Sequence, residues 1–162
     1  MLDLNSDDGR KFLAQLKRHE GAKRNLDGRH IAYRCPAGAL TIGYGHNLDA
    51  NPVPGIAASS QLTDDQADRL LSIDVQRYAE QLDLKLPWAK DLDAPRYAVL
   101  LNMAFNMGLS GLLGFKNTLG MIKAGQYASA GAGMLESKWA KQVKGRAVEL
   151  SRQMTTGKWA SI

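Results

Sequence analysis

Glu20 stands at the end of an apolar helical stripe. Leu13, Leu16 and Glu20 follow one another at spacings of three and four residues, so one helix face would carry all three. A carboxylate on an apolar face loses hydration when it ionises, so its pKa should rise toward neutrality. Such a carboxyl can donate a proton as a general acid. Alternatively, Glu20 ends the helix and points into water, where it has no special chemistry.

A second group of reactive residue types runs from Cys35 to His46. It contains one thiol, the hydroxyl of Thr41, and the glycines Gly43 and Gly45. On a strand, those two glycines would leave one face bare, as expected where a ligand or another chain lies against the backbone. A pair of glycines also marks turns and bulges, Cys35 can be a small buried hydrophobic residue, and Thr41 can be an ordinary strand residue.

Asp74 interrupts the apolar stripe of a long predicted helix, and a buried carboxylate needs a partner. His46, just after the glycine-containing stretch, is a candidate for that partner. Such a pair would raise the pKa of the histidine and tie the helix to the sheet.

The length of 162 residues is enough for one domain or for two small lobes that share a core. Apolar residues make up 44% of the chain and charged residues 23%, which excludes a disordered or collagen-like polymer. No apolar run reaches the roughly 18 residues of a membrane span, and the polar start has no signal-peptide core. With Cys35 as the single cysteine, no internal disulfide can form, which fits a reducing cytoplasm. We therefore expect a soluble protein without an export signal.

The net charge of +5 is concentrated near the C-terminus. Residues 115–162 contain eight lysines and arginines and two glutamates, a charge of +6, whereas 13 basic and 14 acidic residues leave the remainder at −1. A basic region attracts nucleic acid, a membrane surface or an anionic cell wall, or it simply forms a solvated face. The interleaved basic and aromatic residues typical of nucleic-acid binding do not occur.

Local signals predict the helices and strands. We expect a first helix from Asn5 or Ser6, short strands near residues 22–26, 29–34 and 40–45, and a loop at 51–55. The capping box Thr63–Gln66 should begin a long helix that ends before Pro87, about 30 Å at 1.5 Å per residue.

The second half of the chain is predicted to be helical. Asp93 and Pro95 should begin a helix that is apolar on nearly every side and that Gly108 closes. Further helices are expected at residues 117–124, 127–137 and 146–156. The helix that Gly108 closes would form the centre of a helical lobe.

Seven short motifs occur in order between about residues 12 and 160: His19-Glu20-Gly21, Thr41-Ile-Gly-Tyr-Gly-His46, Asn102-Met-Ala-Phe-Asn-Met-Gly108, Gly114-Phe-Lys-Asn-Thr-Leu119, Ser137-Lys-Trp139, Gly145-Arg-Ala147 and Thr156-Gly-Lys-Trp159. Together they resemble the phage-type lysozymes, or endolysins, and the combination is highly specific. The resemblance implies a single α+β catalytic domain with two lobes. The N-terminal lobe, about residues 13–62, would hold a small antiparallel sheet. A long helix, about 63–85, would join it to a helical C-terminal lobe, 86–162 plus the N-terminal helix, with glycan in the cleft between them.

The resemblance further implies a muramidase that hydrolyses the β-1,4 bond between N-acetylmuramic acid and N-acetylglucosamine in peptidoglycan, as a monomer without cofactor or metal. Glu20 matches the catalytic Glu of the family, the general acid, and Thr41 matches the Thr that positions the attacking water. Cys35 occupies the position of the usual Asp, as it does in a subset of endolysins. The stretch between Glu20 and Cys35 is six residues longer than the usual spacing of the family.

Supporting roles are implied in the same way. His46 and Asp74 match a structural pair, and Arg146 matches an arginine that faces the catalytic Glu and would oppose a rise in its pKa. Three further residues match positions that contact glycan, although packing in the core or at its rim would also explain each of them: Asn47, Phe105 and Thr118.

Cys35 leaves the mechanism open. An inverting glycosidase uses a second carboxylate, roughly 6.5–9.5 Å from the first, to activate water. A thiol with a pKa of about 8.5 is a weak base at pH 7. Cys35 either orients water or attacks the anomeric carbon, or Asp27, in an Asp-Gly turn, serves as the base instead.

Two other functions remain open. A lytic transglycosylase needs only one carboxyl group, because the C6 hydroxyl of the sugar itself displaces the leaving group, and a virion module could bind the wall without cleaving it. For an endolysin we expect peptidoglycan glycan strands as substrate, anionic wall or outer-membrane polymers as partners of the basic region, and no nucleic acid. Such an enzyme would wait in the host cytoplasm and reach the wall through a membrane pore.

Overall fold

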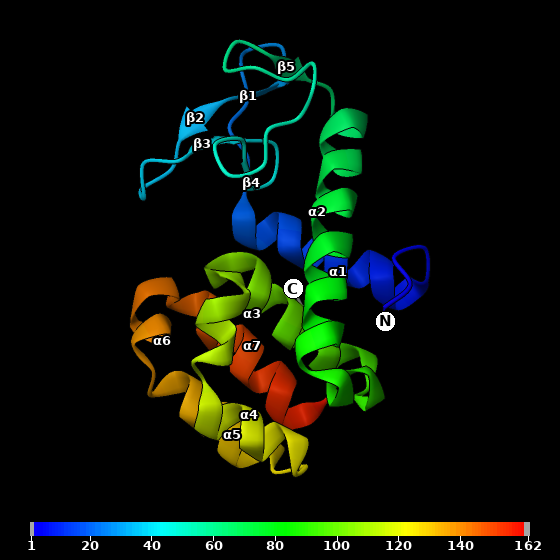
Figure 1. Cartoon of the computed structure of the whole chain (residues 1–162), viewed down its shortest axis with the longest axis vertical. Coiled ribbons are helices and arrows are strands. Elements are labelled where there is room, and N and C mark those ends of the chain that lie inside the picture. Colours follow the sequence, from blue (N-terminus) through cyan, green and yellow to red (C-terminus); the bar gives the residue numbers. More distant parts are fainter. Residues whose placement is uncertain (1, 161–162) are drawn as a thin grey trace. The chain divides into compact units, whose positions relative to one another are not determined.

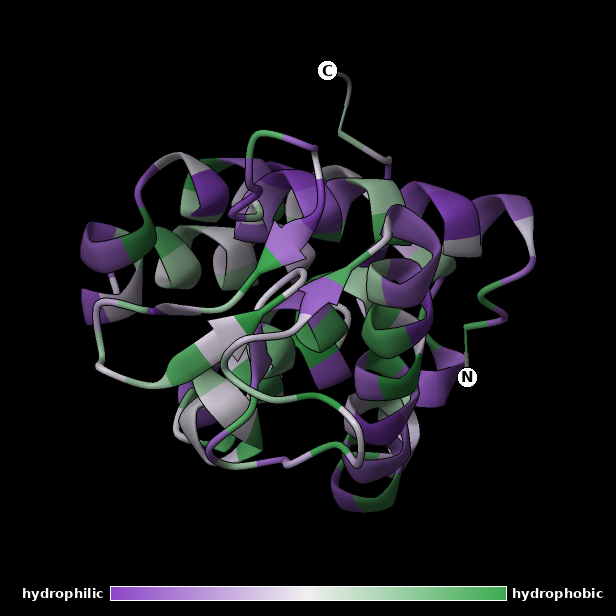
Figure 2. Ribbon diagram, turned by 90° about the horizontal axis from the view of Figure 1, so that it is seen from above, coloured by the Kyte–Doolittle hydropathy of each residue, from purple (hydrophilic) through white to green (hydrophobic). Residues whose placement is uncertain are grey.

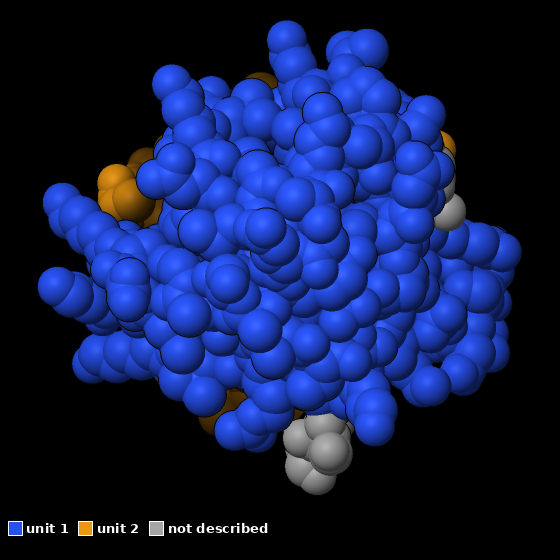
Figure 3. Space-filling view, turned by 90° about the horizontal axis from the view of Figure 1, so that it is seen from below, with its two compact units in different colours: residues 1–12, 77–162 blue, residues 13–76 orange. Residues whose placement is uncertain are grey.

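The computed structural model describes residues 2–160 and divides into two compact units (Figure 3). Unit 2, residues 13–76, contains the five short strands of the described chain, and unit 1, residues 1–12 and 77–162, is helical (Figure 1). Two helices contribute residues to both units: α1, Asp7–Glu20, and α2, Asp64–Lys85. The α+β class is as predicted.

Both of these helices begin where the sequence predicts. Ser6 caps α1, because its hydroxyl accepts a hydrogen bond from the backbone N–H of Gly9 at 3.0 Å. Thr63 and Gln66 form the capping box of α2, with reciprocal side chain to backbone bonds of 2.8 and 3.2 Å. Hydrophilic and hydrophobic residues alternate along the helices (Figure 2), as expected when one face of a helix is buried.

Unit 2 contains two small antiparallel sheets. Strands β2 (Tyr33–Arg34), β3 (Leu40–Ile42) and β4 (His46–Asn47) lie side by side in that order, and β1 (His30–Ile31) pairs with β5 (Gln61–Leu62). Their core consists of four buried aliphatic residues: Ile42, Leu48, Leu62 and Leu70.

The prediction of a strand at residues 22–26 is wrong. This segment makes only an isolated bridge between Arg24 and His30. The side chain of Asn25 accepts hydrogen bonds from the backbone N–H groups of Asp27 and Arg29, both at 3.0 Å. An asparagine that binds the backbone ahead of it favours a turn over a ladder, so the segment forms a loop.

The strand predicted at residues 40–45 ends early, at Ile42. Gly43 and Gly45 have φ angles of 64° and 80°, a left-handed conformation that glycine adopts without a steric penalty. The two glycines therefore form the turn between β3 and β4 and do not line a bare strand face.

Helix α3, Ala94–Leu113, forms the core of unit 1. The Asp93 side chain caps it by accepting from the backbone N–H of Arg96 at 3.0 Å. Residues 97–105 are all buried, which confirms a helix that is apolar on nearly every side. Gly108, with φ 80° and ψ 161°, breaks the helix as predicted, but a further helical stretch continues to Leu113.

The remaining helices of unit 1 are η1 (Pro87–Asp91), α4 (Lys116–Lys123), α5 (Tyr127–Leu135), α6 (Lys138–Val143) and α7 (Gly145–Thr156), and α7 packs against α3, α5 and α6. The sequence analysis missed α6. Ser137 caps it by accepting from the backbone N–H of Ala140, so the predicted helix at 127–137 ends before Ser137. Between residues 2 and 160 no single helix is long and apolar enough to cross a membrane; α3 and α4, bent by 105°, pass that test only as a pair.

Candidate active site

Glu20 is the last residue of α1, and its side chain is partly buried. Gly21 follows with a φ of 65° and closes the helix, and its backbone N–H donates to the carbonyl of Lys17 at 2.9 Å. The helix therefore stops directly after the carboxylate. This termination fixes where the Glu20 backbone lies in unit 2.

Cys35 occupies the first position of the tight turn between β2 and β3. The backbone N–H of Gly38 donates to the carbonyl of Cys35 at 2.8 Å, and the N–H of Cys35 donates to the carbonyl of Ala39 at 3.0 Å. Gly38 has a φ of 87°, so the turn needs glycine there. Asp49 braces the hairpin, because its carboxylate accepts from the Arg34 side chain at 3.1 Å and from the backbone N–H of Leu40 at 2.9 Å.

The turn favours the thiolate form of Cys35. The backbone N–H of Ala39 lowers the pKa of the thiol most; burial, next in size, raises it, and the amide of Ala37, the hydroxyl of Thr41 and the amide of Gly38 lower it further. The Thr41 hydroxyl also lies 3.1 Å from the carbonyl of Ala39. Because it carries one proton, it donates to either the carbonyl or the sulfur. Cys35 therefore becomes a thiolate at a lower pH than an ordinary thiol does.

Tyr33, Cys35 and Thr41 share one face of the β2–β3 hairpin. Tyr33 and Thr41 are direct partners across the two strands, and Cys35 lies two residues after Tyr33, so its side chain points to the same side. Thr41 is in turn the partner of Asn47 on β4. We call the side of Tyr33, Cys35 and Thr41 the hairpin face.

The electrostatic surroundings of Tyr33 connect the hairpin face to Glu20. Burial raises the pKa of the Tyr33 phenol most, and the negative charges of Glu20 and Cys35 raise it further. Both groups therefore lie within electrostatic reach of one phenol. The structure thus brings Glu20, Tyr33, Cys35 and Thr41 together in unit 2; we call them the four-residue site. The sequence analysis missed Tyr33, although its spacing of two from Cys35 was a usable signal.

His46 and Asp74 form a buried pair. His46 Nδ1 lies 2.7 Å from Asp74 Oδ2, and His46 Nε2 lies 2.8 Å from the carbonyl oxygen of Asn51. A carboxylate oxygen and a carbonyl oxygen are both acceptors, so the ring satisfies both of them only when both of its nitrogens carry a proton. The pair connects β4 to α2 within unit 2.

Three of the residues predicted to contact substrate or Glu20 belong to unit 1. Phe105 and Thr118 are buried, with exposed fractions of 8% and 7%, and the Phe105 ring packs 5.4 Å from that of Tyr78. Arg146 Nε donates to Asn102 Oδ1 at 3.0 Å. Asp27, by contrast, belongs to unit 2 and is exposed in the turn that follows Asn25.

Comparison with known proteins decides the family, because residues 17–154 match the phage lysozyme family. The chain belongs to that family. It is 28% identical to an endolysin of Acyrthosiphon pisum secondary endosymbiont phage 1 over 143 residues, which cover 86% of this chain and 85% of the endolysin. It is 27% identical over 161 residues to the pre-baseplate central spike protein Gp5 of Enterobacteria phage T4, a match that covers 88% of this chain and 27% of the spike protein.

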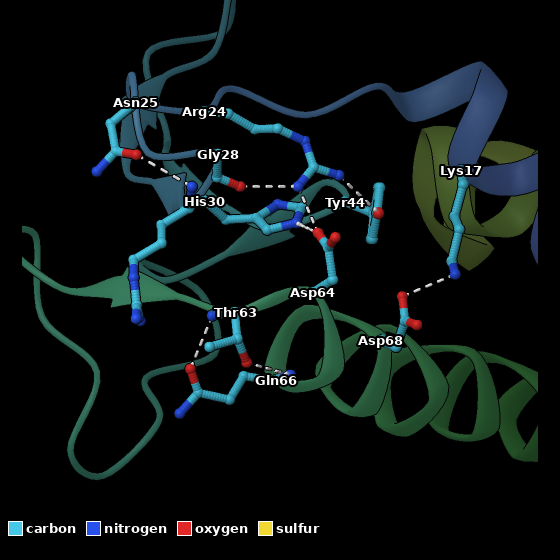
Figure 4. A network of polar contacts seen from close by, with 11 residues as sticks. Lys17, Arg24, Asn25, Gly28, His30, Tyr44, Thr63, Asp64, Gln66 and Asp68 are labelled. Atoms are coloured by element: carbon cyan, nitrogen blue, oxygen red, sulfur yellow. Dashed lines mark hydrogen bonds and ion pairs between the residues drawn. The ribbon is translucent and has the colours of Figure 1, made fainter.

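In this phage lysozyme, Asp64 anchors the loop that follows Glu20 (Figure 4). The Asp64 carboxylate accepts a hydrogen bond from Arg24 and another, of 2.8 Å, from His30 Nε2. Arg24 also donates to the hydroxyl of Tyr44 at 3.2 Å, and the fully buried His30 ring packs edge-on against Tyr44. The first turn of α2 thereby holds the chain four residues after Glu20.

Lys17 provides a second anchor, on the helical side of Glu20. Its ammonium lies 2.7 Å from Asp68, one turn further along α2, and 5.3 Å from the centre of the Tyr44 ring (Figure 4). The backbone is therefore tied to α2 three residues before Glu20 and four residues after it.

Among the described residues, no group of histidines, cysteines and carboxylates is arranged to hold a metal ion.

Replacing Asp64 with asparagine is expected to remove stability that depends on pH. The side-chain hydrogen bond from Arg24 lowers the pKa of Asp64 most, and the bond from His30 lowers it further. A carboxylate whose pKa is lower in the folded state stabilises the fold above its unfolded pKa of about 3.9, and this stability is lost as the pH falls through the folded value. The melting temperature of the variant should therefore lie below that of the wild type at pH 6, and the two should draw together as the pH falls below 4 and through the folded pKa of Asp64.

Asp65→Asn is the matched control for Asp64, because Asp65 lies in the same turn of α2. Both substitutions remove a negative charge from a helix N-terminus, and only Asp64 also loses two side-chain partners. Equal melting curves for the two variants across the pH range would contradict the role of the Asp64 anchor.

Proposed function

We infer from its membership of the phage lysozyme family that this chain is a lysozyme-type protein that cleaves peptidoglycan. We propose that it is an endolysin that hydrolyses the β-1,4 bond between N-acetylmuramic acid and N-acetylglucosamine. In this proposal Glu20 is the general acid, and Cys35 and Thr41 handle the attacking water. The observation that carries the proposal is that the Cys35 thiol and the Thr41 hydroxyl share the hairpin face with Tyr33, whose phenol is within electrostatic reach of Glu20.

The proposed reaction needs one acid and one base. Protonated Glu20 gives its proton to the leaving glycosidic oxygen while the bond to the anomeric carbon breaks. A water oxygen forms the new bond to that carbon, and the released proton goes to the Cys35 thiolate. The lowered pKa of the thiol raises the thiolate fraction near neutral pH, and so supports the base role. If water attacks from the opposite side of the sugar ring, the configuration at the anomeric carbon inverts.

The basic part of unit 1 fits an anionic target. Seven lysine and arginine residues are exposed there: Lys116, Lys123, Lys138, Lys141, Lys144, Arg152 and Lys158. Two glutamates in the same region oppose them, so the positive charge dominates. We propose that this surface attracts anionic wall or outer-membrane polymers, that the enzyme acts as a monomer, and that it reaches the wall from the host cytoplasm through a membrane pore.

Analysis of the products tests the proposed reaction. Purified peptidoglycan is digested, and the fragments are examined by mass spectrometry. A hydrolase releases reducing ends, whereas a lytic transglycosylase releases 1,6-anhydro ends. The anomeric configuration of the first product then separates inversion by water from a covalent intermediate on Cys35. Binding to the wall without release of either kind of end would support a silent wall-binding module.

Replacing Cys35 with serine should reduce activity without abolishing it. A serine hydroxyl can still orient water, but it is a much weaker base than a thiolate, so we expect a rate loss of about 10- to 100-fold. The rate of reducing-end release from peptidoglycan measures the effect. Cys35→Asp, which introduces the usual carboxylate of the family, should be more active than Cys35→Ser, and Cys35→Leu should be inactive. Complete loss in the serine variant would favour covalent attack by the sulfur.

The similarity to the central spike protein supports a second candidate. That protein is much longer than this chain, since the match covers 27% of it. A lysozyme-like domain that works within a virion would have the same four-residue site. The reaction tested above would be the same in both cases, and only its place in the phage cycle would differ.

A further inference from the structure

The hydroxyl of Tyr33 has an unusual position on the hairpin face. The ring is partly buried and faces the same side as Cys35 and Thr41, yet no hydrogen bond from the hydroxyl to another described residue occurs. The other polar groups of the turn are engaged: the Thr41 hydroxyl with Ala39, and the Arg34 side chain with Gly38 and Asp49. A partly buried hydroxyl without a protein partner is available to a water molecule or a substrate.

We propose that Tyr33 is a further catalytic residue, whose O–H donates a hydrogen bond to the attacking water at the four-residue site. The inference rests on the proposed hydrolysis and extends it. A water that attacks the anomeric carbon uses one lone pair for the new bond and gives a proton to the Cys35 thiolate. Its second lone pair is free to accept a hydrogen bond from the Tyr33 O–H, which fixes the direction of attack.

The electrostatics exclude Tyr33 from the acid and base roles. Burial, Glu20 and Cys35 all raise the pKa of the phenol, so it stays protonated at the pH values at which the carboxyl and the thiol change charge. It is therefore a constant donor, and a phenolate nucleophile does not form. Thr41 donates its single proton either to the Ala39 carbonyl or to the thiolate, so it contacts the attacking water only as an acceptor, and the donor role falls to Tyr33.

Tyr33→Phe tests the proposal, because it removes only the hydroxyl and keeps the ring. We expect kcat for release of reducing ends to fall about tenfold, as for loss of one neutral hydrogen bond, while KM changes less than twofold. Because Tyr33 neither gains nor loses a proton, both limbs of the pH–rate profile should keep their positions. The melting temperature should also stay unchanged, since no protein hydrogen bond is lost.

Tyr127→Phe is the matched control, because it also removes one tyrosine hydroxyl, but in unit 1. The Tyr127 ring stacks on the Arg96 guanidinium, 3.7 Å from the ring centre, and phenylalanine retains this contact. It should behave as the wild type in every assay. An unchanged kcat in Tyr33→Phe would overturn the proposal. A rise in KM with unchanged kcat would also overturn it, because Tyr33 would then bind the sugar equally in the ground state and in the transition state. Loss of one limb of the pH–rate profile would overturn it as well, because Tyr33 would then act as an acid or a base. A wild-type protein that releases no reducing ends would refute the proposed function itself.

Discussion

Replacing Glu20 with glutamine is expected to slow peptidoglycan hydrolysis by about 10³- to 10⁴-fold, the upper part of the range for general acid catalysis. Glutamine has nearly the same shape and still forms hydrogen bonds, but it has no acidic proton to give to the leaving oxygen. The effect should be large because Glu20 is the only carboxyl group in the four-residue site. The initial rate of reducing-end release from purified peptidoglycan measures it, and a parallel binding assay should show that the variant still adheres to the wall.

Glu136→Gln is the matched control for this substitution. Glu136 is exposed at the C-terminal end of α5, in unit 1, and the same neutralisation there should leave the rate within a factor of two. A Glu20→Gln variant that cleared peptidoglycan at the wild-type rate would refute the assignment of the acid. A variant that lost both binding and melting temperature would instead show that Glu20 maintains the local fold.

The helices were predictable because each carries its own start and stop signals. The Thr63–Gln66 box and the Asp93 cap are local, since donor and acceptor lie three residues apart, and the structure contains both. Helix α6 shows the limit of this approach. Its Ser137 cap is just as local, but the helix has six residues, too few to show a clear apolar period.

The strands were harder to predict because each has only two or three residues. Alternation of apolar and polar residues needs about four residues to become visible, so hydropathy could not separate strand from turn here. Strand β5 illustrates the difficulty, because its residues pair with β1 residues that lie 30 and 32 positions earlier in the sequence. Gly43 and Gly45 could belong to a strand or to a turn on their types alone, and only their φ angles decided the question.

The candidate site was predictable as far as residue types carry their own chemistry. Glu20 at the end of an apolar stripe and Cys35 before a glycine turn were visible in the sequence. The thiol's environment was not, because it depends on the backbone N–H groups of Ala37, Gly38 and Ala39, which surround Cys35 only once the turn has formed. Tyr33 was missed for a similar reason: its importance follows from the register that places it opposite Thr41.

The second large effect concerns stability, and we expect Asp74→Ala to lower the free energy of unfolding by about 3–5 kcal/mol. Both side chains of the His46–Asp74 pair are 3% exposed, so removing the carboxylate takes from the buried His46 Nδ1 the acceptor that lies 2.7 Å away. A domain of this size has a total stability of about 5–15 kcal/mol, so the loss is a large fraction of it. Urea unfolding at pH 7 measures the change.

A double-variant cycle shows whether the pair itself causes the loss. If the cost of Asp74→Ala comes from an uncompensated His46, then removing His46 as well should cost less than the two single effects together. Lys11→Ala, which breaks the exposed 2.9 Å pair with Asp7, should cost far less than Asp74→Ala, because water screens and replaces that contact. Strictly additive costs for His46 and Asp74 would mean that the two side chains stabilise the fold separately. The link between β4 and α2 would then come from packing around the pair, and the bond between the two side chains would contribute little.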